Sequence, residues 1–261
     1  MRALIGMKSA GPGCAAKSRN DSGFTRPASG AGRKRPILAD FRRFTDKGQS
    51  VAGSPKETVV FVHGLYMTGL ELGLLRLRVS QAGFDTQQFR YHTVLEPVHA
   101  NARHLADYIA GLDATTLHLV GHSLGGLVIL RMFELGVKIP PGRVVLMGSP
   151  VRGSIAARSI AQKNWGWLLG QSGPGGLAEE REPVWSGERE LGVLVGTAGP
   201  GFGLPHPELP RPHDGLVAVE ETRIPGATDQ VELDVHHTGM VFSAEVAEQV
   251  IAFLRTGAFC R

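Results

Sequence analysis

The feature that most constrains this chain is Ser123, which stands between an apolar β-type run at residues 117–120 and an apolar helical run at residues 127–133. Gly121 and Gly125 flank the serine, so the strand and the first helical turn can approach without a Cβ clash. A sharp turn of this kind lifts a hydroxyl clear of a sheet and places a helix N-terminus beneath it. The pattern predicts that Ser123 is the nucleophile of an acyl-bond hydrolase.

The motif is informative because a predicted strand precedes it and a predicted helix follows it. The chain contains 35 glycines, so a bare Gly-x-Ser-x-Gly pattern is weak evidence. The alternative interpretation is a glycine-rich turn between a core strand and a core helix.

A second apolar strand at residues 59–62 ends in His63-Gly64, about sixty residues before the serine. An acyl-transfer enzyme needs two preorganised N–H donors for the tetrahedral oxyanion. We expect these donors to be the backbone N–H groups of Leu65 and Leu124. An ordinary turn that ends a strand is the alternative for His63-Gly64.

Strands and helices alternate along the chain, which predicts an α/β fold with a mostly parallel central sheet flanked by helices on both faces. The expected strands lie near residues 57–63, 84–91, 116–122, 143–149, 190–196 and 229–235. The expected helices lie near residues 68–82, 96–111, 123–136 and 243–255. The last helix has Phe242, Val246, Val250 and Phe253 in one register, and Ser243 can cap its start.

These motifs resemble the α/β-hydrolase superfamily, and within it the bacterial lipase and esterase branch. The resemblance covers about residues 57 to 256 and includes a Gly-Ser-Pro and Gly-Ser pattern in residues 143–154. Lipase-like inositol deacylases share the pattern. The two early antiparallel strands common in the superfamily have no clear counterpart, so we expect a sheet trimmed at its N-terminal strands. In this superfamily, the residue at the position of His122 supports the nucleophile elbow formed with Gly121 and Gly125 and does not transfer protons.

The resemblance implies the chain order serine, acid, histidine. Asp214 begins Asp-Gly-Leu-Val and matches the family's Asp-Gly-x-Val pattern, so we interpret it as the triad acid. Four other carboxylates are rivals. They are Glu220 and Glu221, which suit an exposed stretch, and Asp229 and Asp234, near or within a strand.

The histidine is either His236 or His237. Polar and apolar residues alternate through residues 230–235, which places His236 on the polar face of an outer strand. His237 is then the first residue past the strand, in the loop where the family keeps its histidine. We therefore assign His237 as the general base.

Residues 164–187 break the alternation and combine Trp165 and Trp167 with a Gly-Pro-Gly-Gly segment. The resembled family places a cap here, so we interpret the segment as a lid over an acyl pocket. The alternative is a surface helix that packs its tryptophans on the core.

Charge divides the chain into two parts. Residues 1 to 57 hold 12 Lys and Arg against 4 Asp and Glu. We interpret residues 1–55 as a disordered basic tail, and residues 56–261 as the catalytic domain. A nucleic-acid or membrane-surface role for the basic tail is the alternative. Only two cysteines occur, Cys14 and Cys260, which could pair but make no disulfide framework.

We found no secretory signal and no apolar run long enough to span a bilayer, so we expect a cytoplasmic protein. The sequence predicts a serine esterase or lipase that acts on a small-molecule or lipid ester, with no cofactor, no metal and no nucleic-acid partner. Alternatives are an acyltransferase or thioesterase with the same triad, and a catalytically silent binding module. Acyl length, head group and oligomeric state stay open.

Overall fold

All strand pairs in the described part of the chain are parallel. The structure is a computed structural model that describes residues 57–186, 189–199 and 209–261. Its sheet has six strands in the order β2-β1-β3-β4-β5-β6. The strands are β1 (Glu57–Val62), β2 (Asp85–Phe89), β3 (Thr116–His122), β4 (Val144–Met147), β5 (Leu191–Gly196) and β6 (Asp229–Leu233).

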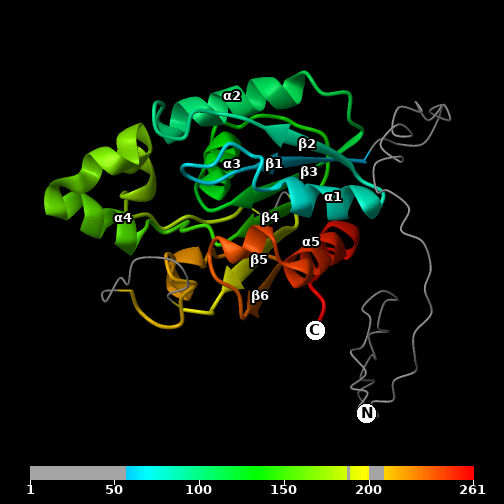
Figure 1. Cartoon of the computed structure of the whole chain (residues 1–261). Coiled ribbons are helices and arrows are strands. Elements are labelled where there is room, and N and C mark those ends of the chain that lie inside the picture. The colour runs from blue at the N-terminus through cyan, green and yellow to red at the C-terminus, as the bar shows by residue number, and fades with distance from the viewer. Residues whose placement is uncertain (1–56, 187–188, 200–208) are drawn as a thin grey trace, which may run out of the picture. The chain divides into compact units, whose positions relative to one another are not determined.

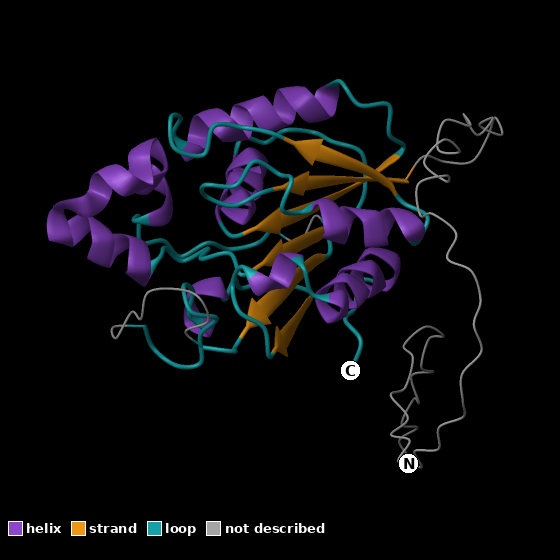
Figure 2. Ribbon diagram, in the orientation of Figure 1, coloured by secondary structure: helices purple, strands orange, loops and turns teal. Residues whose placement is uncertain are grey.

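The helices lie on both faces of this sheet (Figures 1 and 2). They are α1 (Gly73–Gln81), α2 (Val98–Ala110), α3 (Leu124–Glu134), α4 (Ile155–Ile160) and α5 (Ala244–Thr256). Short helical segments are η1 (Ala161–Trp165), η2 (Gly166–Ser172), η3 (Gly173–Leu177), η4 (Val219–Thr222) and η5 (Gly239–Val241). The predicted fold class is confirmed, and all six strands lie where the sequence predicts them.

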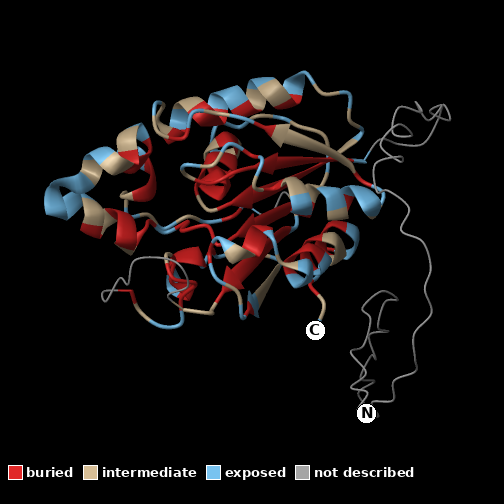
Figure 3. Cartoon of the chain, viewed as in Figure 1, coloured by how far each residue is buried: buried red, intermediate tan, exposed pale blue. Residues whose placement is uncertain are grey.

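Side chains that point alternately to the two faces of the sheet divide the core into two layers. Val60 and Val62 of β1 pack with residues of α2 and α3. Val59 and Phe61 of the same strand pack with residues of α1 and α5 on the opposite face. Successive side chains of a strand point to opposite faces, and both faces of a parallel sheet are covered. Figure 3 accordingly shows β1, β3, β4 and β5 as mostly buried, whereas the edge strands β2 and β6 are mostly of intermediate burial.

The last helix carries its predicted apolar stripe with one exception. Val246, Val250 and Phe253 are buried, and the Ser243 hydroxyl accepts a hydrogen bond from the N–H of Val246 at 3.3 Å. Phe242 is 50% exposed, so its predicted place in the stripe is wrong. It precedes the helix cap, where the helical register no longer determines the direction of a side chain.

The predicted lid segment forms the short helical turns η1, η2 and η3 at the left of Figure 1. Trp165 and Trp167 are 56% and 74% exposed, whereas Leu169 and Leu177 are buried. The alternative interpretation, in which tryptophans of this segment pack on the core, is therefore wrong for Trp165 and Trp167. Trp185, near the end of the same segment, is 6% exposed and does pack on the core, together with the two leucines. Whether the segment moves as a lid stays a prediction.

Several expectations fall outside the described residues. They are the basic tail at 1–55, the contribution of Cys14, and the final residue of the predicted lid segment, 187. Among the described residues, none of the helices combines the length and apolar character that crossing a membrane requires.

Candidate active site

The strand order changes direction between β1 and β3, because the chain adds β2 on one side of β1 and all later strands on the other. Loops that leave the carboxyl ends of strands on either side of such a switch point separate and leave a crevice. His63, Gly64 and Leu65 follow β1, and Ser123 follows β3. The two predicted motifs therefore meet at this edge of the sheet.

Ser123 has φ 53° and ψ −121°, a backbone conformation that non-glycine residues rarely adopt. Its N–H donates to the carbonyl of Met147, at the end of β4, at 2.9 Å. The Ser123 residue is partly exposed between the buried His122 and the buried Leu124. The turn between β3 and α3 thus leaves Ser123 partly accessible to solvent, although both of its neighbours in the sequence are buried.

The glycines around the serine lie where side chains do not fit. A Cβ at Gly125 would be 2.1 Å from the carbonyl oxygen of Val62, and one at Gly121 would be 2.8 Å from the backbone of Gly126. A Cβ at Gly64 would lie 3.1 Å from the Cβ of Ser123. The turn after β1 consequently lies directly against the serine.

Leu124 is the first residue of α3, and the N–H groups of the first helical turn have no partner within the helix. Leu65 lies in the turn after β1 and packs partly buried against the core. Of the two predicted oxyanion donors, Leu124 thus follows Ser123 in the sequence. Leu65 follows Gly64, which lies against Ser123 in the fold.

Asp214 and His237 form a buried hydrogen-bonded pair, with 2.7 Å between the Asp214 Oδ2 and the His237 Nδ1. The other carboxylate oxygen, Oδ1, accepts hydrogen bonds from the N–H groups of Leu216 at 3.0 Å and Val217 at 2.8 Å. The N–H of His237 donates to the Asp214 carbonyl at 3.0 Å. Aspartate and imidazole are therefore fixed by both their side chains and their backbones.

The loops that carry this pair follow β5 and β6, so they reach back over the end of β4 toward β3. Gly148 lies beneath them with φ +54°. A Cβ at this position would be 3.1 Å from the Asp214 Oδ2 and 3.2 Å from the His237 Nδ1. The absence of a side chain at the end of β4 leaves room for the pair.

His122 connects the serine turn to the histidine loop. Its Nε2–H donates to the His237 carbonyl at 3.1 Å, and the two imidazole centroids are 4.9 Å apart. Burial, and to a lesser extent the neighbouring His237, lowers the pKa of His122 to about 3. His122 is therefore a neutral hydrogen-bond donor at neutral pH.

The rival residues lie elsewhere. His236 is exposed and its Nδ1 is 3.3 Å from the Gly199 carbonyl. Glu220 and Asp234 are exposed, and Asp229 bonds to residues near the C-terminus, including the N–H of Phe259 at 2.8 Å. None of these carboxylates is a described hydrogen-bond partner of His237.

Glu221 corrects the sequence interpretation, because it is only 4% exposed. Its carboxylate accepts hydrogen bonds from the N–H groups of Ile155 and Ala218, both at 2.5 Å. Burial raises the pKa of this carboxyl group. These backbone donors explain why an acidic side chain is found inside, which the polar sequence around it did not indicate.

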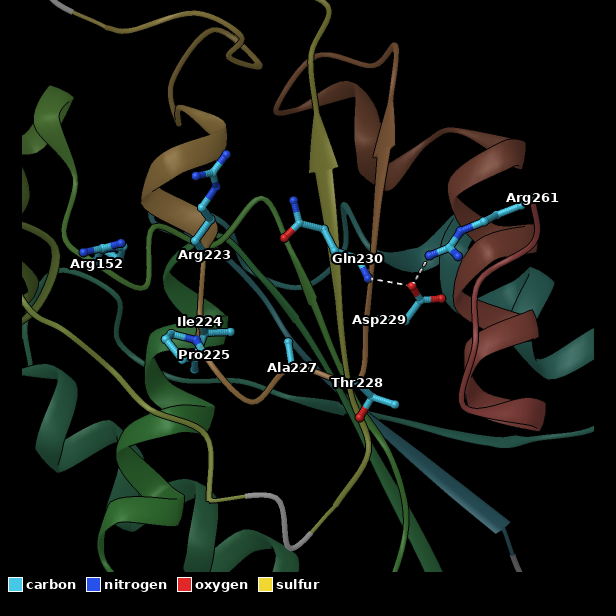
Figure 4. A pocket seen from close by; sticks show the side chains of 9 residues that line it. All are labelled: Arg152, Arg223, Ile224, Pro225, Ala227, Thr228, Asp229, Gln230 and Arg261. Carbon is cyan, nitrogen blue, oxygen red and sulfur yellow. Dashed lines mark hydrogen bonds and ion pairs between the residues drawn. The ribbon is translucent and has the colours of Figure 1, made fainter. Parts of the chain in front are cut away.

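Two cavities lie away from Ser123. One of about 570 Å³ adjoins Asp229, at the amino end of β6 and thus at the opposite edge of the sheet (Figure 4). The other, of about 510 Å³, lies between α4 and η4 and is lined mainly by charged side chains, including Arg158 and Glu221. Neither is the apolar acyl pocket of a lipase.

Comparison with known proteins agrees with this fold. A model of the alpha/beta hydrolase family matches residues 59–249. A search of curated protein sequences found no match.

Solved structures share the fold at low sequence identity. Lipase BlEst2 of Bacillus licheniformis in its mature form is 19% identical, with 78% of this chain and 94% of the lipase covered and a TM-score of 0.57. RedJ thioesterase of the prodiginine pathway in Streptomyces coelicolor is 14% identical over 83% and 98% of the two chains, with a TM-score of 0.52. A lipase-esterase related protein from Clostridium acetobutylicum is 11% identical over 77% and 94%, with a TM-score of 0.54.

Proposed function

Because the chain belongs to the alpha/beta hydrolase family, we propose that it is a serine hydrolase that cleaves carboxylic esters through an acyl-enzyme. The observation that carries this proposal is the buried hydrogen bond between Asp214 and His237, next to the strained turn at Ser123. A carboxylate on Nδ1 holds the tautomer whose Nε2 can take a proton.

Acylation begins when the Ser123 Oγ attacks the ester carbonyl carbon and its proton passes to the Nε2 of His237. The carbonyl π electrons become an oxyanion, which the N–H groups of Leu65 and Leu124 stabilise. When the intermediate collapses, the bond to the alcohol breaks and His237 gives the proton to the departing oxygen. The acyl group is then esterified to Ser123.

Deacylation repeats these steps with water as the nucleophile. His237 removes a proton from water, hydroxide adds to the acyl carbon, and Ser123 leaves with the proton. Asp214 stays ionised and stabilises the imidazolium in both halves of the reaction. The N–H groups of Leu216 and Val217 donate to its Oδ1 and hold the carboxylate in place.

Thioester hydrolysis is the second candidate, because a thioesterase is among the structures with this fold. The same triad would serve, and only the leaving group would change from alcohol to thiol. A transferase would use an acceptor alcohol in place of water. A catalytically silent binding module is disfavoured, because the paired Asp214 and His237 would have no role in it.

A matched substrate panel separates these candidates. We expect the purified chain to hydrolyse p-nitrophenyl esters between acetate and palmitate, and we expect Ser123→Ala to be inactive. The same acyl groups as N-acetylcysteamine thioesters report thioesterase activity, and product analysis with added alcohols reports transfer. Faster turnover of every thioester than of its matching ester would favour the thioesterase, and ester turnover that survives Ser123→Ala would refute the proposal.

A further inference from the structure

The peptide group between Gly64 and Leu65 carries the N–H that the proposed mechanism uses as an oxyanion donor. Its carbonyl oxygen belongs to Gly64 and points away from the N–H, because the peptide is trans. That oxygen accepts hydrogen bonds from the His63 Nδ1–H at 3.1 Å and from the Met67 N–H at 3.3 Å. One end of this peptide group is therefore fixed within its own turn.

The two neighbouring peptide groups are held by side chains of another loop. The Tyr91 hydroxyl donates to the His63 carbonyl at 2.7 Å, and the Tyr66 N–H donates to the Thr93 Oγ1 at 3.2 Å. Tyr91 and Thr93 both belong to the loop between β2 and α2. This loop thus binds the turn immediately before and immediately after the Gly64–Leu65 peptide.

Both side chains have little freedom to move. Thr93 is 7% exposed, and the Tyr91 ring stacks on the His63 imidazole with 4.5 Å between centroids. Burial raises the pKa of Tyr91, so its hydroxyl stays protonated and can donate. Burial also lowers the pKa of His63, which keeps that imidazole neutral.

The turn needs this support because its backbone is unusual. Tyr66 has φ +59°, a region that non-glycine residues seldom occupy and that costs free energy unless the surroundings impose it. A hydrogen-bond donor contributes to catalysis only when it is already aimed at the position of the developing negative charge.

We infer that Tyr91 and Thr93 are positioning residues that hold the Leu65 N–H toward the oxyanion. They touch no reacting atom and act through the peptide groups on either side of Gly64–Leu65. The same loop also contacts η2 of the predicted lid segment, because the Gln171 N–H donates to the Val94 carbonyl at 2.9 Å. The inference rests on the proposed function, since it needs Leu65 to be an oxyanion donor.

The test uses two conservative pairs. Thr93→Val keeps the shape of the side chain and removes the acceptor, and Thr93→Ser keeps the acceptor. Tyr91→Phe removes only a hydroxyl, and Tyr108→Phe makes the same change on α2. Losing an oxyanion donor outright costs about 100- to 1000-fold in kcat, so loosening its support should cost less.

We expect kcat for p-nitrophenyl butyrate to fall about tenfold in Thr93→Val and Tyr91→Phe, with KM changed by less than about twofold. The Ki of a trifluoromethyl ketone, whose oxyanion occupies the same site, should rise by the same factor. Thr93→Ser and Tyr108→Phe should keep both values. A merely structural role would not link kcat to the affinity for this transition-state analogue.

Unchanged kcat in both Thr93→Val and Tyr91→Phe would overturn the inference, as would a fall in kcat without a matching rise in Ki. These outcomes differ from failure of the proposed function. In that case the full chain would lack ester turnover, or Ser123→Ala would retain it.

Discussion

The free energy of unfolding should fall less between pH 7 and pH 5 when His122 is replaced by glutamine. His122 is 1% exposed, and burial together with the nearby His237 and His63 lowers its pKa to about 3, although Asp214 opposes the shift. The unfolded chain has a histidine pKa near 6.5. Between these two values, the unfolded state binds a proton at this residue that the folded state does not.

The sign follows from this difference. Stability rises with pH wherever the unfolded state binds more protons, so the contribution of His122 is present at pH 7 and is lost as the pH falls below about 6.5. One such group lowers the free energy of unfolding by about 2 kcal/mol between pH 7 and pH 5. His63 and His118, whose pKa values burial also lowers, act in the same direction.

Urea unfolding at pH 7 and pH 5 measures this contribution. We expect the difference in unfolding free energy between the two pH values to be about 2 kcal/mol smaller in His122→Gln than in the unaltered chain. Glutamine has an amide donor that does not titrate between these pH values. His99→Gln, at an exposed position of α2, is the control and should keep the full difference. An undiminished pH dependence in His122→Gln would refute the argument.

Two further variants, each with a matched control, test the site. His237→Ala should lower kcat for a p-nitrophenyl ester by roughly a thousandfold, the scale of a lost general base in a triad. His236→Ala, the control, should keep at least half of the kcat of the unaltered chain. The reverse result would show that His236, and not His237, is the base. Gly148→Ala should lower kcat at least about tenfold, because its Cβ would lie 3.1 Å from Asp214 Oδ2 and its φ is +54°. Gly73→Ala, where no atom lies within 4 Å of the added Cβ, is the control and should be fully active.

The sequence predicted the features that depend on local pattern. The alternation of strand-like and helical segments predicted the sheet, and the glycines around Ser123 indicated the turn. The alternation through residues 230–235 also distinguished the buried His237 from the exposed His236. Each of these predictions used the period of an element or a turn that only certain residues permit.

Several contacts between distant segments were not predicted. Glu221 is buried because the backbone N–H groups of Ile155 and Ala218 bind its carboxylate, and no local pattern marks those donors. Tyr91 and Thr93 lie in a polar loop after β2, and only the fold brings their hydroxyl groups to the turn after β1. Likewise, aromatic residues at 165 and 167 gave no indication that they are exposed.

The reactivity of Ser123 is the most direct test of the central claim. A fluorophosphonate reacts with a serine that an adjacent base activates, so incubation followed by peptide mass spectrometry identifies the modified residue. We predict one adduct per chain, on the tryptic peptide that contains Ser123, and much slower labelling in His237→Ala. An unmodified Ser123 in the folded chain, or an adduct on another serine, would contradict the account.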